Sequence, residues 1–258
     1  MTASTTALAH PKIRERLEAV EDEQVRRRAR KFIALGVLAL LALAAFGVTR
    51  SPLLDVDEVR VIGATTTGPN ALRVVAGIEP GAPLLGLDLE AAEARLLALP
   101  EVASVSSNRT WDGLVTLEVL ERRRVANITT ADGTLVVADD GMVVSMDEYA
   151  DPMLPRIAGA MFSTPVGGLV PVELADGVAT AAALPSDIAR VTDHIRVGSD
   201  TVSLVLVGGG IAEMGDAREL DAKFDALRAF LAQVNLGCLE SLDVRAPGVP
   251  VLARSAGC

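Results

Sequence analysis

The sequence predicts an α+β protein in which a single transmembrane helix precedes two small domains. Three features support this prediction. Residues 32–48 form an uncharged apolar run, residues 54–124 give the order strand, helix, helix, strand, strand, and residues 125–258 hold short strands that end in an amphipathic helix and a hairpin. The second domain is expected to be a mostly antiparallel β domain, because short turns join most of its strands.

Charge is divided unevenly along the chain, whose formal net charge is −10. Residues 1–31 carry eight Lys and Arg against five Asp and Glu, so the remainder of the chain is strongly acidic. An acidic surface repels phosphate, which argues against nucleic acid as a partner. Aromatic residues make up only 3% of the chain, so its cores must be built mainly from Val, Leu, Ile and Ala.

The apolar run from Phe32 to Val48 is close to the lower limit of about 17 residues for crossing hydrocarbon. It follows the basic segment RRRARK at 26–31, and the positive-inside rule then places the N-terminus in the cytoplasm. We therefore expect a cytoplasmic tail at 1–31, a membrane helix at 32–49 and an extracytoplasmic body. The large apolar side chains that would contact lipid are Phe32, Leu35, Leu38, Leu41, Leu43 and Phe46.

A cleaved signal peptide is the alternative interpretation of the apolar run. Small residues such as Ala42 and Ala44 could mark a cleavage site. Against it, thirty-one residues precede the run, and the run is longer than the usual apolar region of about 7 to 15 residues. An uncleaved anchor is therefore the favoured prediction.

The first domain is predicted from turn and capping signals. Gly77 can end the first helix, Asp88 can cap the second, and Asp112-Gly113 can form the turn of a hairpin. The expected elements are a strand at 56–63, helices at 68–78 and 89–99, and strands at 102–108 and 114–121.

The second domain begins with three strands separated by two Asp-Gly turns. A loop is expected at 149–171, where prolines and glycines are frequent, and the helix at 218–235 carries an apolar stripe. The other expected elements are strands at 125–130, 134–139 and 142–147, a small helix within 172–184, strands at 195–197 and 202–207, a short strand ending at Gly215, and a final hairpin around Pro247-Gly248.

Several motifs of the first domain resemble the POTRA domain of the FtsQ/DivIB cell-division family. They are the VxVxG strand at 59–63, LPEV at 99–102, Trp111 before the last strand, and the exit at Glu121, Arg122, Val125 and Ala126. Asp112 and Arg123-Arg124 stand where prolines are common in the family. The segment from Met214 to Arg254 is similar to the family's ending, so the resemblance covers about residues 26–254.

The resemblance implies a POTRA domain at 54–124, an FtsQ-type β domain at 125–258, and a function as a divisome scaffold in the cell membrane at the septum. It implies FtsB and FtsL as partners and leaves FtsW, FtsI and FtsK as further candidates. A POTRA-containing export or envelope-assembly component is the alternative. Such export proteins continue into a long β-barrel, which a chain of 258 residues is too short to hold as well.

The last strand of the chain is a candidate binding site, because an edge strand can accept a strand from another protein. In the family, this strand and the preceding helix receive a segment of FtsB. The positions that correspond in this sequence are Lys223, Arg245, Val249, Val251, Leu252, Ala253 and Arg254.

No catalytic or metal-binding constellation is found in the sequence. The two histidines, His10 and His194, lie on opposite sides of the predicted membrane and cannot share a site. The glycine run at 208–210 lacks the Lys-Ser/Thr of a phosphate loop. We therefore expect a protein that is not an enzyme and needs no cofactor, metal or small-molecule substrate.

Cys238 and Cys258 are the only cysteines. Folding the final hairpin about Gly248 would bring them opposite one another, and a disulfide there would add roughly 3 kcal/mol by closing a short loop. A disulfide and two free thiols both remain open, because the end of a chain frays.

Overall fold

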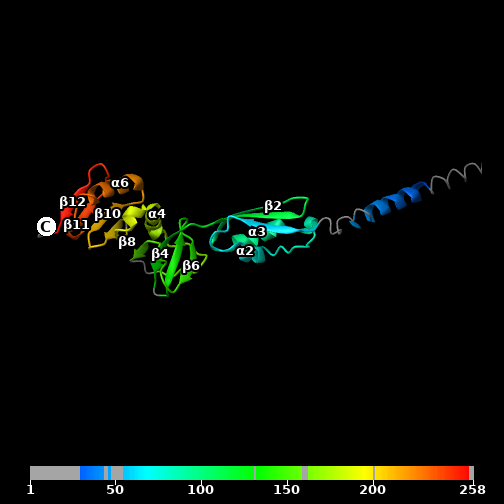
Figure 1. Ribbon diagram of the computed structural model, residues 1–258, viewed down its shortest axis with the longest axis horizontal. Helices are drawn as coiled ribbons and strands as arrows, with labels where there is room; N and C mark the ends of the chain where they lie inside the picture. The colour runs from blue at the N-terminus through cyan, green and yellow to red at the C-terminus, as the bar shows by residue number, and fades with distance from the viewer. Residues whose placement is uncertain are drawn as a thin grey trace, which may run out of the picture. The chain divides into compact units, whose positions relative to one another are not determined.

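A computed structural model of the protein describes residues 30–43, 46–47, 55–130, 132–158, 162–199 and 201–255. These residues form an N-terminal helical segment, a three-stranded sheet with two α-helices, and a nine-stranded sheet with three α-helices (Figure 1). The predicted POTRA domain and the predicted β domain thus each contain a sheet of their own. The exact division at 124/125 stays a prediction.

The N-terminal segment is helical at 30–43 and 46–47, and its side chains, including those of the predicted lipid-contacting residues, are exposed. Within the part of the chain that the structure describes, no helix is both long enough and apolar enough to cross a membrane. Most of the predicted tail at 1–31 and part of the predicted span at 32–49 lie outside the described residues.

The first sheet has the strand order β1-β3-β2 and confirms the predicted order of elements. Both helix-end predictions are also confirmed. Gly77 ends α2 with a left-handed φ of 65°, and Asp88 caps α3 by accepting the Ala91 N–H at 2.9 Å. The elements are β1 (Glu58–Ile62), α2 (Pro69–Ala76), the 3₁₀ turn η2 (Leu84–Gly86), α3 (Leu89–Leu97), β2 (Val102–Arg109) and β3 (Leu114–Glu121).

A carboxylate at the end of β3 holds the loop that follows β1. Glu121 accepts the backbone N–H groups of Thr65, Thr66 and Thr67 at 3.1, 2.7 and 2.8 Å, and the Thr65 hydroxyl at 2.6 Å. Partial burial of this carboxyl group raises its pKa, but these hydrogen bonds outweigh burial and lower the pKa from 4.5 to about 2. The ionised form therefore stabilises the fold.

Substituting Glu121→Gln is expected to lower the free energy of unfolding at pH 7 by about 1 to 2 kcal/mol, after allowance for solvent screening. Because the folded-state pKa lies below the unfolded value, the difference from the wild type should be complete above pH 4.5 and shrink as pH falls toward 2. Chemical unfolding of the full-length protein across this pH range measures it. Glu118→Gln, at an exposed position of β3, is the control. An equal loss from both substitutions would contradict the capping role.

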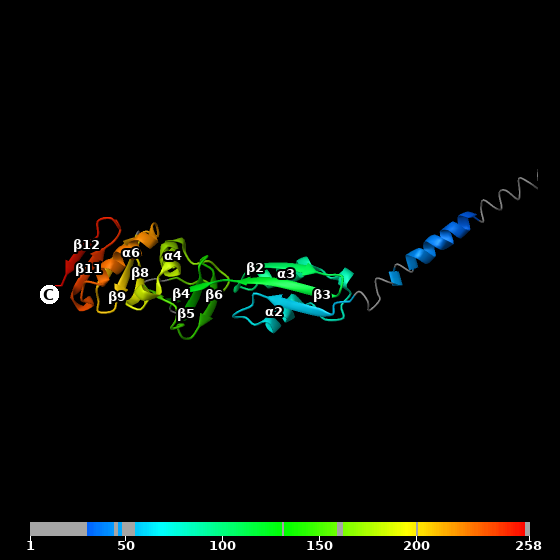
Figure 2. The same cartoon turned by 45° about the horizontal axis from the view of Figure 1, so that its top comes forward.

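The second sheet has the strand order β12-β11-β10-β9-β8-β7-β4-β5-β6 (Figures 1 and 2). Five neighbouring pairs are antiparallel and three are parallel, so the sheet is mixed. Its strands are β4 (Arg124–Thr129), β5 (Thr134–Ala138), β6 (Val143–Asp147), β7 (Arg156–Ala158), β8 (Thr192–Val197), β9 (Val202–Leu206), β10 (Ile211–Gly215), β11 (Leu239–Asp243) and β12 (Val251–Arg254).

Strand β7 corrects the prediction of a continuous loop at 149–171. It is three residues long and lies between β4 and β8, parallel to both. A strand this short has no detectable alternation, and its pairing depends on strands far away in the sequence. The helices are α4 (Ala175–Ala183), which confirms the predicted small helix, α5 (Ser186–Ala189), which was not predicted, and α6 (Leu220–Leu231).

The core of this sheet includes the apolar stripe predicted on the last helix. Phe224 and Leu227 of α6 are fully buried, and Leu220 and Leu231 pack against the same cluster. Helix α6 connects β10 to β11, which are parallel, as a helical crossover requires. The helix thereby brings the end of the chain to one edge of the sheet.

Candidate functional site: the terminal edge of the sheet

The last strand, β12, occupies one end of the nine-stranded sheet and pairs on its inner side with β11. Among the described residues no strand covers its other side. The register pairs Leu242 with Leu252 and Asp243 with Val251. The hairpin is therefore centred nearer Pro247 than the predicted Gly248, and a register shift within β11 moves its far end by one further residue.

The direction of the β12 amides follows from one hydrogen bond. Ser255, directly after the strand, donates its N–H to the Cys238 carbonyl oxygen at 3.0 Å, so its amide faces the inner neighbour. Because successive amides of a strand point to opposite sides, the N–H groups of Leu252 and Arg254 face away from β11. The outer side of β12 therefore presents backbone donors to which another strand could bind.

The predicted contact residues of the last strand differ in exposure. Val249 and Val251 are exposed, as is Arg254, whereas Leu252 packs against the core of the sheet. Ala253 is half-buried. The outward amides and the exposed side chains together form a surface that we call the terminal edge, made of Val249 and Val251–Arg254.

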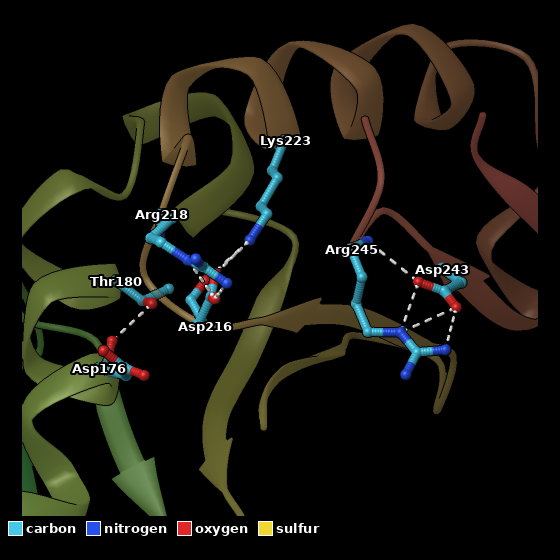
Figure 3. A network of polar contacts seen from close by, with 7 residues as sticks. All are labelled: Asp176, Thr180, Asp216, Arg218, Lys223, Asp243 and Arg245. Atoms are coloured by element: carbon cyan, nitrogen blue, oxygen red, sulfur yellow. Dashed lines mark hydrogen bonds and ion pairs between the residues drawn. The ribbon is translucent and has the colours of Figure 1, made fainter. Parts of the chain in front are cut away.

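Lys223, a predicted contact residue on α6, is buried. Its side chain is only 3% exposed, and its Nζ donates to the Asp216 carbonyl oxygen at 2.8 Å and to Asp216 Oδ1 at 3.1 Å (Figure 3). Arg218 also pairs with the Asp216 carboxylate. The hydrogen bonds from Arg218, and then from Lys223, lower the pKa of Asp216 well below its usual value. These three residues form a network that fixes the connection between β10 and α6.

Arg245 follows β11 and forms an ion pair with Asp243, with both Nε–carboxylate oxygen distances at 3.0 Å (Figure 3). Its hydrogen bonds lower the pKa of the Asp243 carboxyl group. Arg245 and Lys223 line a common cavity of about 470 Å³, together with Thr201, Gly215, Asp216, Arg218 and Glu219. The structure therefore brings together two predicted contact residues, from α6 and from the end of β11, at one polar cavity.

The cavity beside Lys223 and Arg245 is formed by ion-paired side chains. Over the described ranges, no group of three or more His, Cys, Asp or Glu side chains is placed to hold a metal ion. The cavity is lined by ion-paired groups and lacks histidine and cysteine. Its chemistry suits the binding of a polar or charged segment.

The family described as "POTRA domain, FtsQ-type" matches residues 54–122. "Cell division protein FtsQ" of Streptomyces venezuelae is 31% identical over 228 residues, which cover 86% of this chain and 83% of the relative. The chain belongs to the FtsQ/DivIB family of cell division proteins.

Other members of the FtsQ/DivIB family give a consistent picture. FtsQ of Streptomyces collinus is 32% identical over 243 residues, which cover 89% of this chain and 90% of the relative. "Cell division protein DivIB" of Brevibacillus brevis is 26% identical over 204 residues, which cover 74% and 77%. The similarity therefore extends through both sheets and is not limited to the POTRA domain.

Sequence reasoning missed Asp216 and Arg218 as members of the polar network around Lys223. The sequence feature that could have indicated Asp216 is its place directly after a predicted strand, seven residues before Lys223, the only lysine after the apolar run. Cys238 is disulfide-bonded, and no free cysteine occurs among the described residues. Cys258 lies outside them, so the pairing of Cys238 with Cys258 stays a prediction.

Proposed function

We propose that this chain is a non-catalytic scaffold of the divisome, which binds FtsB and FtsL through the terminal edge and bridges early and late division proteins at the septum. The observation that supports this proposal best is the uncovered side of β12, with amides at Leu252 and Arg254 that face away from the sheet. Backbone pairing at such an edge gives affinity, and exposed alternate side chains give selectivity.

The proposed topology is a single-pass protein of the cell membrane. Residues 32–49 would span the bilayer, 1–31 would lie in the cytoplasm, and the POTRA domain at 54–124 and the β domain at 125–258 would lie outside. The uncharged run and the preceding RRRARK segment support this orientation. FtsW, FtsI and FtsK are further candidate partners, and no nucleic acid, cofactor or small-molecule substrate is part of the proposal.

Binding of FtsB to the full-length protein tests the edge-strand proposal through two substitutions at one position. Arg254→Pro removes an outward amide, and Arg254→Ala keeps it while removing the same side chain. A lost interstrand hydrogen bond worth about 1.4 kcal/mol weakens binding about tenfold, so Arg254→Pro should bind FtsB at least about tenfold more weakly than Arg254→Ala. Affinity measured with purified FtsB in complex with FtsL gives the comparison.

Two controls separate lost binding from lost folding. Both Arg254 variants should unfold near the wild-type temperature, because proline is tolerated where a strand amide faces outward. Val251→Pro should instead destabilise the hairpin, since the Val251 amide faces β11. Leu252 is unsuitable for this purpose because its side chain packs on the core. Equal FtsB binding by Arg254→Pro and Arg254→Ala would exclude strand addition at β12.

A further inference from the structure

The only tryptophan of the chain is strongly exposed. Trp111 lies in the turn between β2 and β3, and 75% of its surface is accessible. Tryptophan is highly buried on average, and this indole leaves a large apolar surface in solvent that a partner or a membrane interface could cover. A second large apolar side chain, Leu85 in η2, is 42% exposed.

Hydrogen bonds hold the Trp111 turn against the first residues of the domain. The N–H groups of Asp57 and Glu58 both contact the Gly113 carbonyl oxygen, at 2.9 and 3.3 Å. Gly113 has a φ of 83°, and a Cβ added there would lie 2.6 Å from Asp57 Oδ2, so only glycine fits. The backbone two residues after Trp111 is thus held against the point where the chain enters the first sheet.

The loop that carries Leu85 is hydrogen-bonded to Val56, just before the first strand. The Val56 N–H donates to the Ala82 carbonyl oxygen at 2.8 Å, and Val56 accepts the Gly81 N–H at 2.7 Å. Arg109, at the end of β2, donates from Nη1 to the Leu84 carbonyl oxygen at 3.0 Å. Two loops with exposed apolar side chains therefore lie beside the start of the domain.

The length of chain before this point limits its distance from the apolar run. Six residues, 49–54, separate Val48 from Asp55, and a chain of this length reaches at most about 25 Å even when fully extended. The interfacial layer of a bilayer extends about 5 to 8 Å beyond the hydrocarbon on each side. If residues 32–49 span the bilayer, Trp111 is tethered within reach of that layer.

We propose that Trp111, supported by Leu85, inserts into the interfacial layer of the membrane on the extracytoplasmic side and attaches the first domain to the lipid surface. This inference rests on the membrane anchor of the proposed function. Indole suits this layer because its ring is apolar while its N–H still finds polar partners. Asp112 belongs to the turn, and Asp55 and Asp57 lie next to Gly113, so the attachment depends on apolar insertion and does not require anionic lipid.

The single tryptophan provides a direct test, because all tryptophan fluorescence of the chain comes from Trp111. The full-length protein is placed in nanodiscs of zwitterionic phospholipid, with or without bromine on the acyl chains near the headgroup. Brominated lipid should quench the emission severalfold, and aqueous acrylamide should quench it weakly. Emission that brominated lipid leaves unchanged and acrylamide quenches fully would overturn the proposal.

A matched variant tests whether the contact is specific to the turn. Trp111→Phe combined with Tyr149→Trp moves the fluorophore to another strongly exposed position, which no short tether holds near the anchor. Its emission should remain accessible to acrylamide and insensitive to brominated lipid. Equal lipid quenching at both positions would overturn a specific role of Trp111. So would blue-shifted emission without lipid quenching, which would indicate that Trp111 is buried against protein.

The same samples distinguish failure of this inference from failure of the proposed function. Retention of the chain in the lipid fraction after an alkaline wash reports on the anchor at 32–49. A chain that is washed away contradicts the proposed topology. A chain that is retained but shows no lipid quenching contradicts only the insertion of Trp111.

Discussion

Replacing Asn127 with alanine is expected to lower the free energy of unfolding by about 3 kcal/mol, since three side-chain hydrogen bonds are lost at a buried position. Asn127 lies on β4 and is completely buried. Its Nδ2 donates to the carbonyl oxygens of Asp151 and Leu154 at 2.7 and 3.2 Å, and its Oδ1 accepts the Asp151 N–H at 3.2 Å. Alanine would leave these three backbone groups without their partners.

The effect of Asn127→Ala should be concentrated in the loop before β7. Asp151 and Leu154 belong to this loop, whose residues line a cavity of about 650 Å³ together with α5. Hydrogen exchange at 151–155 should therefore accelerate more than exchange in β10 and β11. Asn108→Ala, at an exposed position of β2, is the control and should change stability by less than about 0.5 kcal/mol. Similar losses from both substitutions would contradict the anchoring role of Asn127.

The buried position of Asn127 could not be derived from the sequence. The sequence predicts the strand at 125–130, but alternation along a strand does not tell which distant groups a polar side chain on it will contact. Burial of this amide depends on the loop from β6 to β7, which returns to β4 from more than twenty residues away. Side-chain partners that distant leave no local pattern.

Elements with local signals were predicted more accurately than elements that depend on distant pairing. Asp88 capped its helix and the stripe of α6 was buried as expected, because capping and amphipathic periodicity act within a few residues. The predictions for residues 156–158 and for the register of β12 were wrong, since β7 pairs with two distant strands and the register of β12 depends on the geometry of the turn before it and on an irregularity in β11. The terminal edge was predicted from chain order, but its outward amides required the structure.

Burial of Lys223 is the largest change that the structure makes to the candidate site. As a predicted contact residue, Lys223 should be accessible to a partner, yet its ammonium group is enclosed and bonded to Asp216. Glu219, which precedes the helix, has a left-handed φ of 51°, a conformation unfavourable for a residue with a side chain. The Lys223–Asp216 contact bridges this turn and fixes the connection between β10 and α6.

Lys223→Met, which keeps the length of the side chain, is expected to lower the free energy of unfolding by about 2 kcal/mol, because a hydrogen bond from a charged donor to the Asp216 carbonyl oxygen is lost. We also expect weaker FtsB binding, through displacement of the cavity that Lys223 shares with Arg245. Chemical unfolding and FtsB affinity of the full-length protein measure the two effects. Loss of both stability and FtsB binding would show that the buried ammonium group supports binding indirectly, by positioning Asp216 and the cavity that Lys223 shares with Arg245.

Arg245→Met separates positioning from direct contact. Arg245 is more than half exposed, and its ion pair with Asp243 contributes little to stability, as is usual at a surface. Its substitution should weaken FtsB binding while leaving the free energy of unfolding within about 0.5 kcal/mol of the wild type. If Lys223→Met instead keeps wild-type stability and loses FtsB binding, its ammonium group must reach the partner directly, and the connection between β10 and α6 must open when FtsB binds.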